Sequence, residues 1–323
     1  MKAIVIGENG PEVSDAAKPE PKPNEVLTRV AACGLNRADV LLASGAFPGV
    51  QSGAGVIIGM EWSGEVEAVG SEVKGFAPGD RVMCAGSSGY AEYAVSDHGR
   101  TMKIPANNMS YRQAATFPIA LQTMHNAVVT QGRLVKGETV LIQGASSGVG
   151  LMAMQIARQM GASQVFGTST NEIRRSRLSE FGADAAFDSN NGAWVDEVLA
   201  KTDGAGVDLI IDQVSGSMAN QNMAATKIRG RIVNVGRLGG GIAEFNFDLH
   251  ALRRIEYIGV TFRTRSVEEI REIVSGVQHD LGPAIADGTL SVPIDKIFPL
   301  KEAPAALEYM AANQHFGKIV LEV

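Results

Sequence analysis

A glycine-rich turn near the middle of the chain carries the residue types best suited to chemistry. The sequence GASSGVG at 144–150 follows a continuously apolar strand at 139–143, and the helix after it has its apolar residues on one face. Such a turn brings backbone N–H groups together with the positive end of a helix, which attracts a pyrophosphate. Gly148 and Gly150 leave room for a ligand and for the strand to approach closely. We therefore predict that this turn binds a dinucleotide.

The end of the next predicted strand, at 164–168, bears on the choice of dinucleotide. The usual NAD-binding unit carries an Asp or Glu there for the ribose hydroxyls. This chain has neutral hydrogen-bonding residues followed by arginines: Ser169, Thr170, Asn171, Arg174, Arg175 and Arg177. A carboxylate would repel a 2′-phosphate, whereas hydroxyl and guanidinium groups would bind it. The pattern favours NADPH over NADH, with Arg174 nearest the strand end; Arg175 and Arg177 fit equally well as solvated charges on a helix face.

The elements that must position this turn alternate between strands and helices. Six apolar strands are predicted at 139–143, 164–168, 185–187, 207–212, 231–235 and 256–260. The helices between them include 172–181, 194–201 and 218–228. Strands that alternate with helices in this way are typical of a doubly wound parallel sheet, so we predict an α/β fold for this region.

The residues on either side of this region show a different pattern of predicted elements. Residues 1–120 contain short strands between segments rich in Gly, Pro and Ser, as in a small β-barrel; the strands are predicted at 2–6, 26–32, 64–69, 80–83 and 90–95. A helix is predicted over 110–132, with Ser110 as its N-cap. The C-terminal part adds helices at 266–287 and 303–313 and extended segments at 293–298 and 318–323. We expect this last part to rejoin the first domain.

Composition excludes several classes of protein. The chain has 323 residues, of which 45% are apolar and 20% charged, which is ordinary for a globular protein of two domains. A net charge of −6 gives no attraction to nucleic acid or to an anionic membrane. Two cysteines, Cys33 and Cys84, are too few for a disulfide framework or a structural zinc site. The apolar run at the N-terminus is too short for a signal peptide, and we expect a cytoplasmic protein.

Six motifs distributed along the chain make it resemble a known family. They are ACGLNRAD at 32–39, GMEWSGEV at 59–66, PGDRV at 78–82, GYAEY at 89–93, GASSGVG at 144–150 and HFGKIVL at 315–321. The sequence resembles the medium-chain dehydrogenase/reductase superfamily, in its zinc-independent quinone oxidoreductase (zeta-crystallin-like) branch. The resemblance implies a GroES-like β-barrel catalytic domain, residues 1–121 and 262–323, with a Rossmann domain inserted at 122–261. It also implies NADPH between the domains and a homodimer paired near 240–248.

The resemblance bears directly on a possible metal. Zinc-dependent relatives place a Cys where Asn36 stands and a His where Met60 stands. Neither residue supplies the thiolate or imidazole that a catalytic zinc needs, and Glu61 alone is not a site. We therefore predict no metal. Without a Lewis acid, the acceptor must already be electrophilic, such as a quinone or the C=C bond of an α,β-unsaturated carbonyl, with hydrogen bonds meeting the developing oxyanion.

The resemblance also implies which residues form the site. The cofactor contacts are Asn36 and Thr123 on the nicotinamide side, Ser146, Gly148 and Val149 at the pyrophosphate, Ser169, Thr170, Asn171 and Arg174 at the 2′-phosphate, and Asn234, Gly236, Phe262, Gly317 and Lys318 along the nicotinamide half. The catalytic candidates are Asn36 and Arg263, although Arg263 fits a structural salt bridge equally well. Phe47, Met60 and Tyr90 are candidate walls of the substrate pocket.

Two other functions remain open at this point. A narrower enzyme of the same family would reduce an enoyl thioester carried on CoA or on a carrier protein, but residues 40–60 offer no basic segment to hold a CoA tail. A protein of the same fold could also bind NADPH without catalysing a reaction. The small-molecule reductase is the function that we expect.

Overall fold

The computed structural model describes residues 1–45, 53–106 and 109–323, and its contacts divide the described chain into two units. The terminal unit combines Met1–Ile119 with Arg263–Val323, and the central unit holds Ala120–Phe262. Helix α3 (Pro118–His125) contains the first boundary between them. The sequence placed the boundaries after residue 121 and before residue 262.

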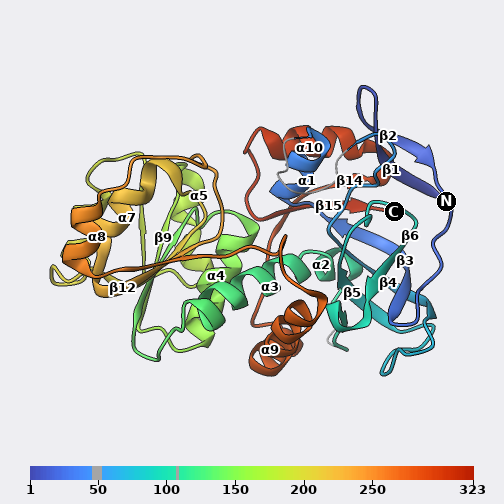
Figure 1. Ribbon diagram of the computed structural model, residues 1–323, viewed down its shortest axis with the longest axis horizontal. Helices are drawn as coiled ribbons and strands as arrows, with labels where there is room; N and C mark the ends of the chain where they lie inside the picture. The colour runs from blue at the N-terminus through green and yellow to red at the C-terminus, as the bar shows by residue number, and fades with distance from the viewer. Residues whose placement is uncertain (46–52, 107–108) are drawn as a thin grey trace. The chain divides into compact units, whose positions relative to one another are not determined.

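Among the described residues of the central unit, six parallel strands form one sheet in the order β10-β9-β8-β11-β12-β13. Two of them, β9 and β12, are labelled in Figure 1. The strands are β8 (Thr139–Gln143), β9 (Gln164–Thr168), β10 (Ala185–Phe187), β11 (Val207–Asp212), β12 (Thr226–Asn234) and β13 (Glu256–Gly259). The predicted parallel sheet is confirmed, and the bounds of β8 to β11 are those that the apolar runs predict. This order is that of a doubly wound nucleotide-binding sheet, in which β8 and β11 meet at the switch point.

Helices cover the sheet of the central unit. They are η2 (Asn126–Gln131), α4 (Gly148–Gln159), α5 (Glu172–Ser176), η3 (Leu178–Phe181), α6 (Trp194–Lys201), η4 (Gly216–Met218), α7 (Ala219–Ala225) and α8 (Phe247–Arg253). Helix α4 packs on β8 and β9, whereas α7 and α8 pack on β12 (Figure 1). The predicted helix at 218–228 is wrong at its end, because Thr226 already pairs with Val207 of β11. Strand pairing there overrides the helical pattern, and β-branched Thr226 and Ile228 suit a strand.

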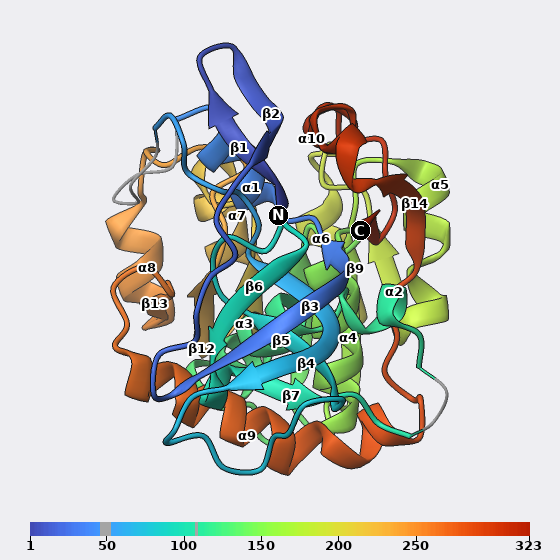
Figure 2. The ribbon, with the colours of Figure 1, turned by 90° about the vertical axis from the view of Figure 1, so that its right-hand side faces the viewer.

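In the described part of the terminal unit, seven strands form a sheet in the order β14-β15-β3-β4-β5-β7, with β6 paired to β3 (Figure 2). The strands are β3 (Glu25–Gly34), β4 (Glu61–Val69), β5 (Arg81–Ala85), β6 (Tyr93–Asp97), β7 (Thr101–Lys103), β14 (Ile294–Pro299) and β15 (Lys318–Glu322). A hairpin of β1 (Lys2–Gly7) and β2 (Gly10–Asp15) extends beside them. Strand β15 pairs antiparallel with β3, so the C-terminal segment rejoins the first domain as expected.

The terminal unit has few helices, which are α1 (Arg37–Ala43), η1 (His98–Arg100), α2 (Tyr111–Ala114), α9 (Val267–Ala286), η5 (Leu300–Glu302) and α10 (Ala303–Ala311). The single helix predicted over 110–132 is wrong. Ser110 caps a short helix, α2, and a new helix begins at Pro118. Proline disfavours the helical conformation at the residue before it and lacks an N–H group, so the helix cannot run through this point.

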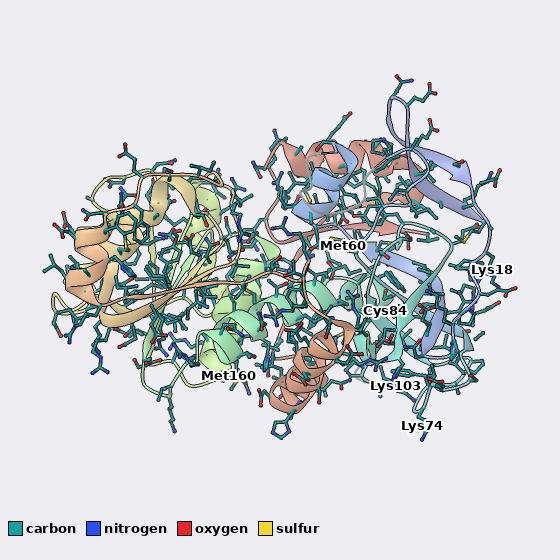
Figure 3. The ribbon with its side chains drawn as sticks, viewed as in Figure 1. Lys18, Met60, Lys74, Cys84, Lys103 and Met160 are labelled. Atoms are coloured by element: carbon teal, nitrogen blue, oxygen red, sulfur yellow. The ribbon has the colours of Figure 1, made fainter. Side chains whose placement is uncertain are left out.

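Large side chains fill the core of the terminal unit. Trp62, Tyr90 and Leu35 are almost completely buried there, together with Cys33 and Cys84. Cys84, which lies on β5, is labelled in Figure 3. Burial raises the pKa of both thiols, so they behave as small apolar residues. Within the described ranges, no helix has both the length and the apolar composition needed to cross a bilayer.

The capping box of α9 provides a test of this fold. Ser266 Oγ accepts a hydrogen bond from the Glu269 backbone N–H at 3.2 Å, and Glu269 Oε2 accepts one from the Ser266 N–H at 2.8 Å. We expect Ser266→Ala to lower the free energy of unfolding by about 1 kcal/mol, because the Glu269 N–H loses its acceptor, the Ser266 hydroxyl oxygen. Urea unfolding measures the change. The same substitution at Ser275, exposed in the middle of α9, is the control and should not destabilise the protein, since alanine favours a helix.

Candidate functional site

The glycine turn of the central unit is held by the residues that begin α4. Ser147 is the N-cap of this helix, and its Oγ accepts a hydrogen bond from Gly150 N at 3.1 Å. A side chain at Gly150 would bring a Cβ within 2.7 Å of the Ala145 Cα, so only glycine allows this close approach. Gly144 has a φ of +71°, which glycine adopts without strain. The turn is therefore built around the backbone, as phosphate binding requires.

A buried network of hydrogen-bonded side chains holds the turn in position. Thr168 Oγ1 accepts from Gly144 N at 3.1 Å and donates to Gln143 Oε1 at 2.6 Å. Gln143 Nε2 in turn donates to Asn222 Oδ1 at 2.7 Å, and Gln213 Nε2 donates to the Gln143 carbonyl at 3.2 Å. These side chains tie the ends of β8, β9 and β11 to α7. The position of the turn thus depends on hydrogen bonds between strands that are distant in the sequence.

The end of β9 brings two of the predicted cofactor residues together. The hydroxyl groups of Ser146 and Ser169 form a hydrogen bond of 3.1 Å. Asn171 caps α5, with its Oδ1 accepting from Arg174 N at 3.0 Å. Thr170 is exposed, and Arg174 is half-buried. Short hydroxyl side chains beside a glycine turn fit a phosphorylated ribose, and no carboxylate stands at this strand end to oppose a 2′-phosphate.

The two neighbouring arginines, Arg175 and Arg177, form ion pairs with other residues of the central unit. Arg175 Nη1 donates to the Ser169 carbonyl at 3.0 Å and forms an ion pair of 3.1 Å with Asp188. Arg177 forms an ion pair of 3.0 Å with Glu180 on the surface. Arg175 therefore braces the backbone of the β9 end, and Arg177 belongs to the solvated helix face. Arg174, which follows the strand end most closely, stays the predicted partner of a phosphate.

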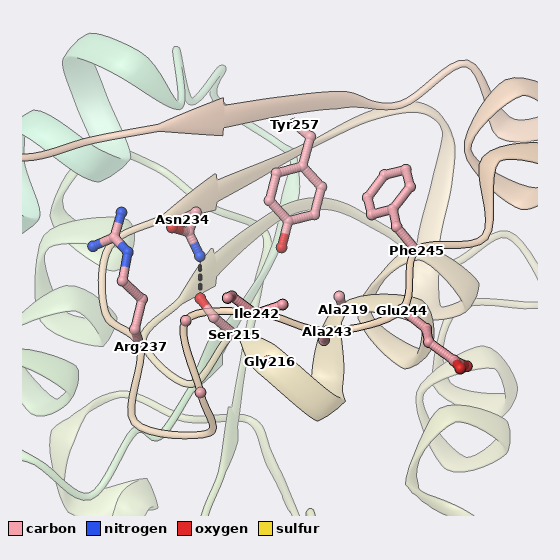
Figure 4. A pocket seen from close by; sticks show the side chains of 12 residues that line it. Ser215, Gly216, Ala219, Asn234, Arg237, Ile242, Ala243, Glu244, Phe245 and Tyr257 are labelled. Atoms are coloured by element: carbon pink, nitrogen blue, oxygen red, sulfur yellow. Dashed lines mark hydrogen bonds between the residues drawn. The ribbon is translucent and has the colours of Figure 1, made fainter.

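A cavity of about 220 Å³ lies beside the ends of β11 and β12 (Figure 4). Asn234 Nδ2 donates to Ser215 Oγ in its wall, and Ser215 Oγ donates to the Gly236 carbonyl at 2.6 Å. A Cβ at Gly236 would lie 2.3 Å from the Gln213 carbonyl oxygen, so this close approach requires glycine. Asn234 and Gly236, both predicted to contact the nicotinamide half, are thus brought together. The Tyr257 side chain lines the same cavity, and burial raises its pKa to about 12.

The terminal unit contains a second polar site, around Asn36. Lys318 Nζ donates to Asn36 Oδ1 at 2.8 Å, to the Leu35 carbonyl at 3.1 Å and to Glu61 Oε1. Asn36 Nδ2 donates to the same Glu61 oxygen at 2.9 Å. Glu61 is fully buried and Lys318 is 3% exposed, so this is an ion pair in the protein interior. Two predicted site residues, Asn36 and Lys318, are in direct contact here.

Asp39 extends this site to Tyr90. Its Oδ2 accepts hydrogen bonds of 2.8 Å from both the Tyr90 hydroxyl and the Asn36 backbone N–H. Its Oδ1 has no hydrogen-bond partner among the described residues. Burial, opposed by these hydrogen bonds, raises the pKa of Asp39 to about 7. Tyr90 is fully buried, so its phenol orients Asp39, and its contact with a substrate stays a prediction.

The other predicted residues are distributed over both units. Thr123 lies half-buried on α3, Phe262 is half-buried, and Arg263 is exposed. Gly317 has a φ of +86°, and a Cβ there would lie 2.3 Å from the Pro293 carbonyl oxygen, which explains the glycine without a ligand. Met60, labelled in Figure 3, is half-buried next to Glu61. Phe47 lies outside the described residues.

Sequence reasoning missed the partners that hold these residues. In the sequence Glu61 is a lone carboxylate, and no motif spacing indicates a role for Asp39, Gln143 or Thr168. A signal was present for Glu61, since an acid inside an apolar strand needs a buried cation, and Lys318 is a cation at the start of another apolar strand. Within the described ranges, no three His, Cys, Asp or Glu side chains are grouped as a metal site.

The raised pKa of Asp39 leads to a prediction about stability. Between the ordinary value of 3.8 and about 7, the folded protein holds a proton on Asp39 that the unfolded chain releases. The contribution of Asp39 to the free energy of unfolding of the wild type therefore falls as the pH rises through this range. Relative to wild type, Asp39→Asn should gain stability from about pH 4 to about pH 7, at about 1.4 kcal/mol for each unit of pKa difference.

Urea unfolding at several pH values measures this gain. The control is Asp15→Asn on the surface, where a hydrogen bond from Lys2 lowers the pKa of Asp15 and the pH dependence must have the opposite sign. A difference between Asp39→Asn and wild type that is independent of pH would contradict the raised pKa.

Comparison with known proteins agrees with this two-part architecture. A profile described as an alcohol dehydrogenase GroES-like domain matches residues 22–106, and one described as a zinc-binding dehydrogenase matches residues 148–278. The predicted fold, a GroES-like domain with a parallel Rossmann-like sheet, is confirmed. A mycobacterial protein whose structure was solved with NADPH is 26% identical, with a TM-score of 0.89 and coverage of 100% of both chains.

Two relatives differ in length. The chain is 32% identical over 316 residues to a phenolphthiocerol/phthiocerol polyketide synthase of Mycobacterium tuberculosis; the match covers 96% of this chain but 14% of that protein. It is 31% identical over 329 residues to the quinone oxidoreductase of Rattus norvegicus, covering 99% of this chain and 97% of that protein. The chain therefore belongs to the medium-chain dehydrogenase/reductase superfamily of oxidoreductases, in its quinone oxidoreductase-like branch.

Proposed function

We propose that this chain is a zinc-independent reductase that uses NADPH to reduce a quinone or the C=C bond of an α,β-unsaturated carbonyl. The observation that carries the proposal is the environment of Asn36. An amide occupies the position of a zinc-binding Cys, and a buried Lys318–Glu61 ion pair holds it. Such a site offers a hydrogen-bond donor instead of a Lewis acid. It therefore suits an acceptor that is already electrophilic.

The residues of the central unit fit an NADPH molecule. The backbone turn at 144–150 suits the pyrophosphate, because it leads into the N-terminus of α4, which Gly150 allows to approach the turn closely. The hydroxyl pair of Ser146 and Ser169 suits the adenosine ribose, and Arg174 suits the 2′-phosphate. When bound, the cofactor supplies a hydride. The protein contributes binding, orientation and the Asn36 amide, whose N–H can stabilise negative charge on the acceptor oxygen.

We also propose that the protein is a cytoplasmic homodimer. Support for a dimer comes from four large apolar side chains that the central unit exposes in the segment between β12 and the edge strand β13. They are Leu238, Ile242, Phe247 and Leu252, with exposures of 60%, 96%, 76% and 76%. Exposed apolar residues in such a group are typical of an interface between proteins. Two cysteines that form no disulfide among the described residues agree with a reducing compartment.

Oxidation of NADPH tests the proposed reaction. NADPH absorbance should fall when a small quinone or a small enone is added, and the rate should be unchanged after treatment with a chelator. An enoyl thioester is included as the competing acceptor, and a higher rate with it would favour that alternative. NADPH that binds but is not oxidised by any acceptor would contradict the reductase and support a binding protein. Loss of activity on chelation would contradict zinc independence.

A substitution at Arg174 tests the choice of cofactor. Arg174→Glu should raise the KM for NADPH by about tenfold or more and leave the KM for NADH nearly unchanged, because a charge-assisted hydrogen bond to a phosphate becomes a repulsion. Arg177→Glu makes the same change in charge three residues away, on a surface ion pair with Glu180 that is worth little, and is the control. Equal changes for both cofactors would show that Arg174 does not bind the 2′-phosphate.

A further inference from the structure

The ammonium group of Lys318 is fully used inside the protein. It has three hydrogens, and they point to three acceptors: the Leu35 carbonyl, Asn36 Oδ1 and Glu61 Oε1. The side chain is 3% exposed. A fourth acceptor on a cofactor or substrate would have to displace one of these partners. This geometry argues against the direct cofactor contact that the sequence predicted for Lys318.

The contacts of Lys318 and Glu61 determine how the Asn36 amide is oriented. An ammonium group only donates hydrogen bonds and a carboxylate only accepts them. The amide oxygen must therefore face Lys318, and the amide nitrogen must face Glu61, as the distances of 2.8 Å and 2.9 Å show. A flip of the amide would place NH₂ against the ammonium and oxygen against the carboxylate. One Nδ2 hydrogen of Asn36 then remains without an acceptor in the described part of the chain.

Other residues hold the carboxylate of Glu61 in place. Its second oxygen, Oε2, accepts a hydrogen bond from the Ile119 backbone N–H at 2.8 Å. A Cβ at Gly34 would lie 2.6 Å from Glu61 Oε1 and 2.3 Å from the Ala115 carbonyl oxygen, so the glycine of the ACGLNRAD motif makes room for the carboxylate. A buried ion pair contributes little net stability, because desolvation offsets its attraction. Its use in orienting a neighbouring group explains it better.

We propose that Glu61 and Lys318 are positioning residues, which hold the Asn36 amide in one orientation and leave its free Nδ2 hydrogen for the reactants. The role of that hydrogen rests on the proposed reductase function. Lys318 itself does not touch the cofactor; it acts through Asn36.

A double-mutant cycle tests this proposal. Lys318→Met combined with Glu61→Gln removes both charges, so that neither is left alone in the interior. We expect this pair of substitutions to lower kcat/KM for the acceptor between about tenfold and about a hundredfold. In an Asn36→Ala background, the same pair should cause no further loss. The Kd for NADPH is measured by fluorescence without an acceptor. In the Asn36→Ala background, this Kd should be the same with and without the Lys318→Met and Glu61→Gln substitutions. An equal rise of this Kd in both backgrounds would mean direct contact of Lys318 with the cofactor and would overturn the proposal.

Nuclear magnetic resonance tests the orientation without any reaction. The side-chain amide signals of Asn36 are assigned by their absence in Asn36→Ala. In the wild type without ligand, the Asn36 amide hydrogen that is hydrogen-bonded to Glu61 should exchange with water much more slowly than the second amide hydrogen. The double substitution should abolish this difference in exchange rate. Equal, fast exchange of both hydrogens in the wild type would overturn the proposal. This measurement stands if the double variant fails to fold or if no acceptor is reduced, so failure of the positioning role and failure of the reductase function are distinguishable.

Discussion

The buried ion pair between Glu61 and Lys318 joins the two segments of chain from which the terminal unit is built. The partners are 257 residues apart, and the whole central unit is inserted between them. Glu61 begins β4 and Lys318 begins β15, and both strands pair with β3. Removing one partner of such a pair costs about 3–5 kcal/mol, because the other charge is left in the interior. The site at Asn36 therefore exists only when the terminal unit has been closed by its C-terminal strand.

The central unit follows the same principle with neutral groups. The glycine turn is a local feature, but its support comes from Gln143, Thr168 and Gln213 at the ends of three parallel strands. Each of these side chains is buried and has hydrogen-bond partners, as polar groups in an interior require. In both units, then, a buried polar network holds the residues of the site. In the terminal unit its members Glu61 and Lys318 lie within motifs far apart in the sequence, whereas in the central unit Gln143, Thr168 and Gln213 lie outside the GASSGVG motif.

The fold was accessible from the sequence where the local pattern and the tertiary structure agree. The strands β8 to β11 are short apolar runs bounded by polar or glycine residues, a pattern typical of strands in a parallel sheet that is covered on both faces. Predictions were wrong where the local sequence pattern favours one structure and the tertiary contacts favour another. The helix predicted through residue 228 gives way to β12 because Thr226 pairs with β11, and Pro118 divides the helix predicted over 110–132. Strand β2 was not predicted because Gly10 and Pro11 interrupt its pattern.

The sequence by itself determined the glycine turn, the strand end without an acid and the absence of Cys and His at residues 36 and 60. These are local properties, since backbone geometry and the charge of a side chain do not depend on distant residues. Only the tertiary structure decided which charged and polar groups pair with each other. Arg175 is paired with Asp188, and the hydrogens of Lys318 go to Leu35, Asn36 and Glu61. No pattern within a short window contains these pairings, because hydrogen bonds are satisfied by neighbours in space.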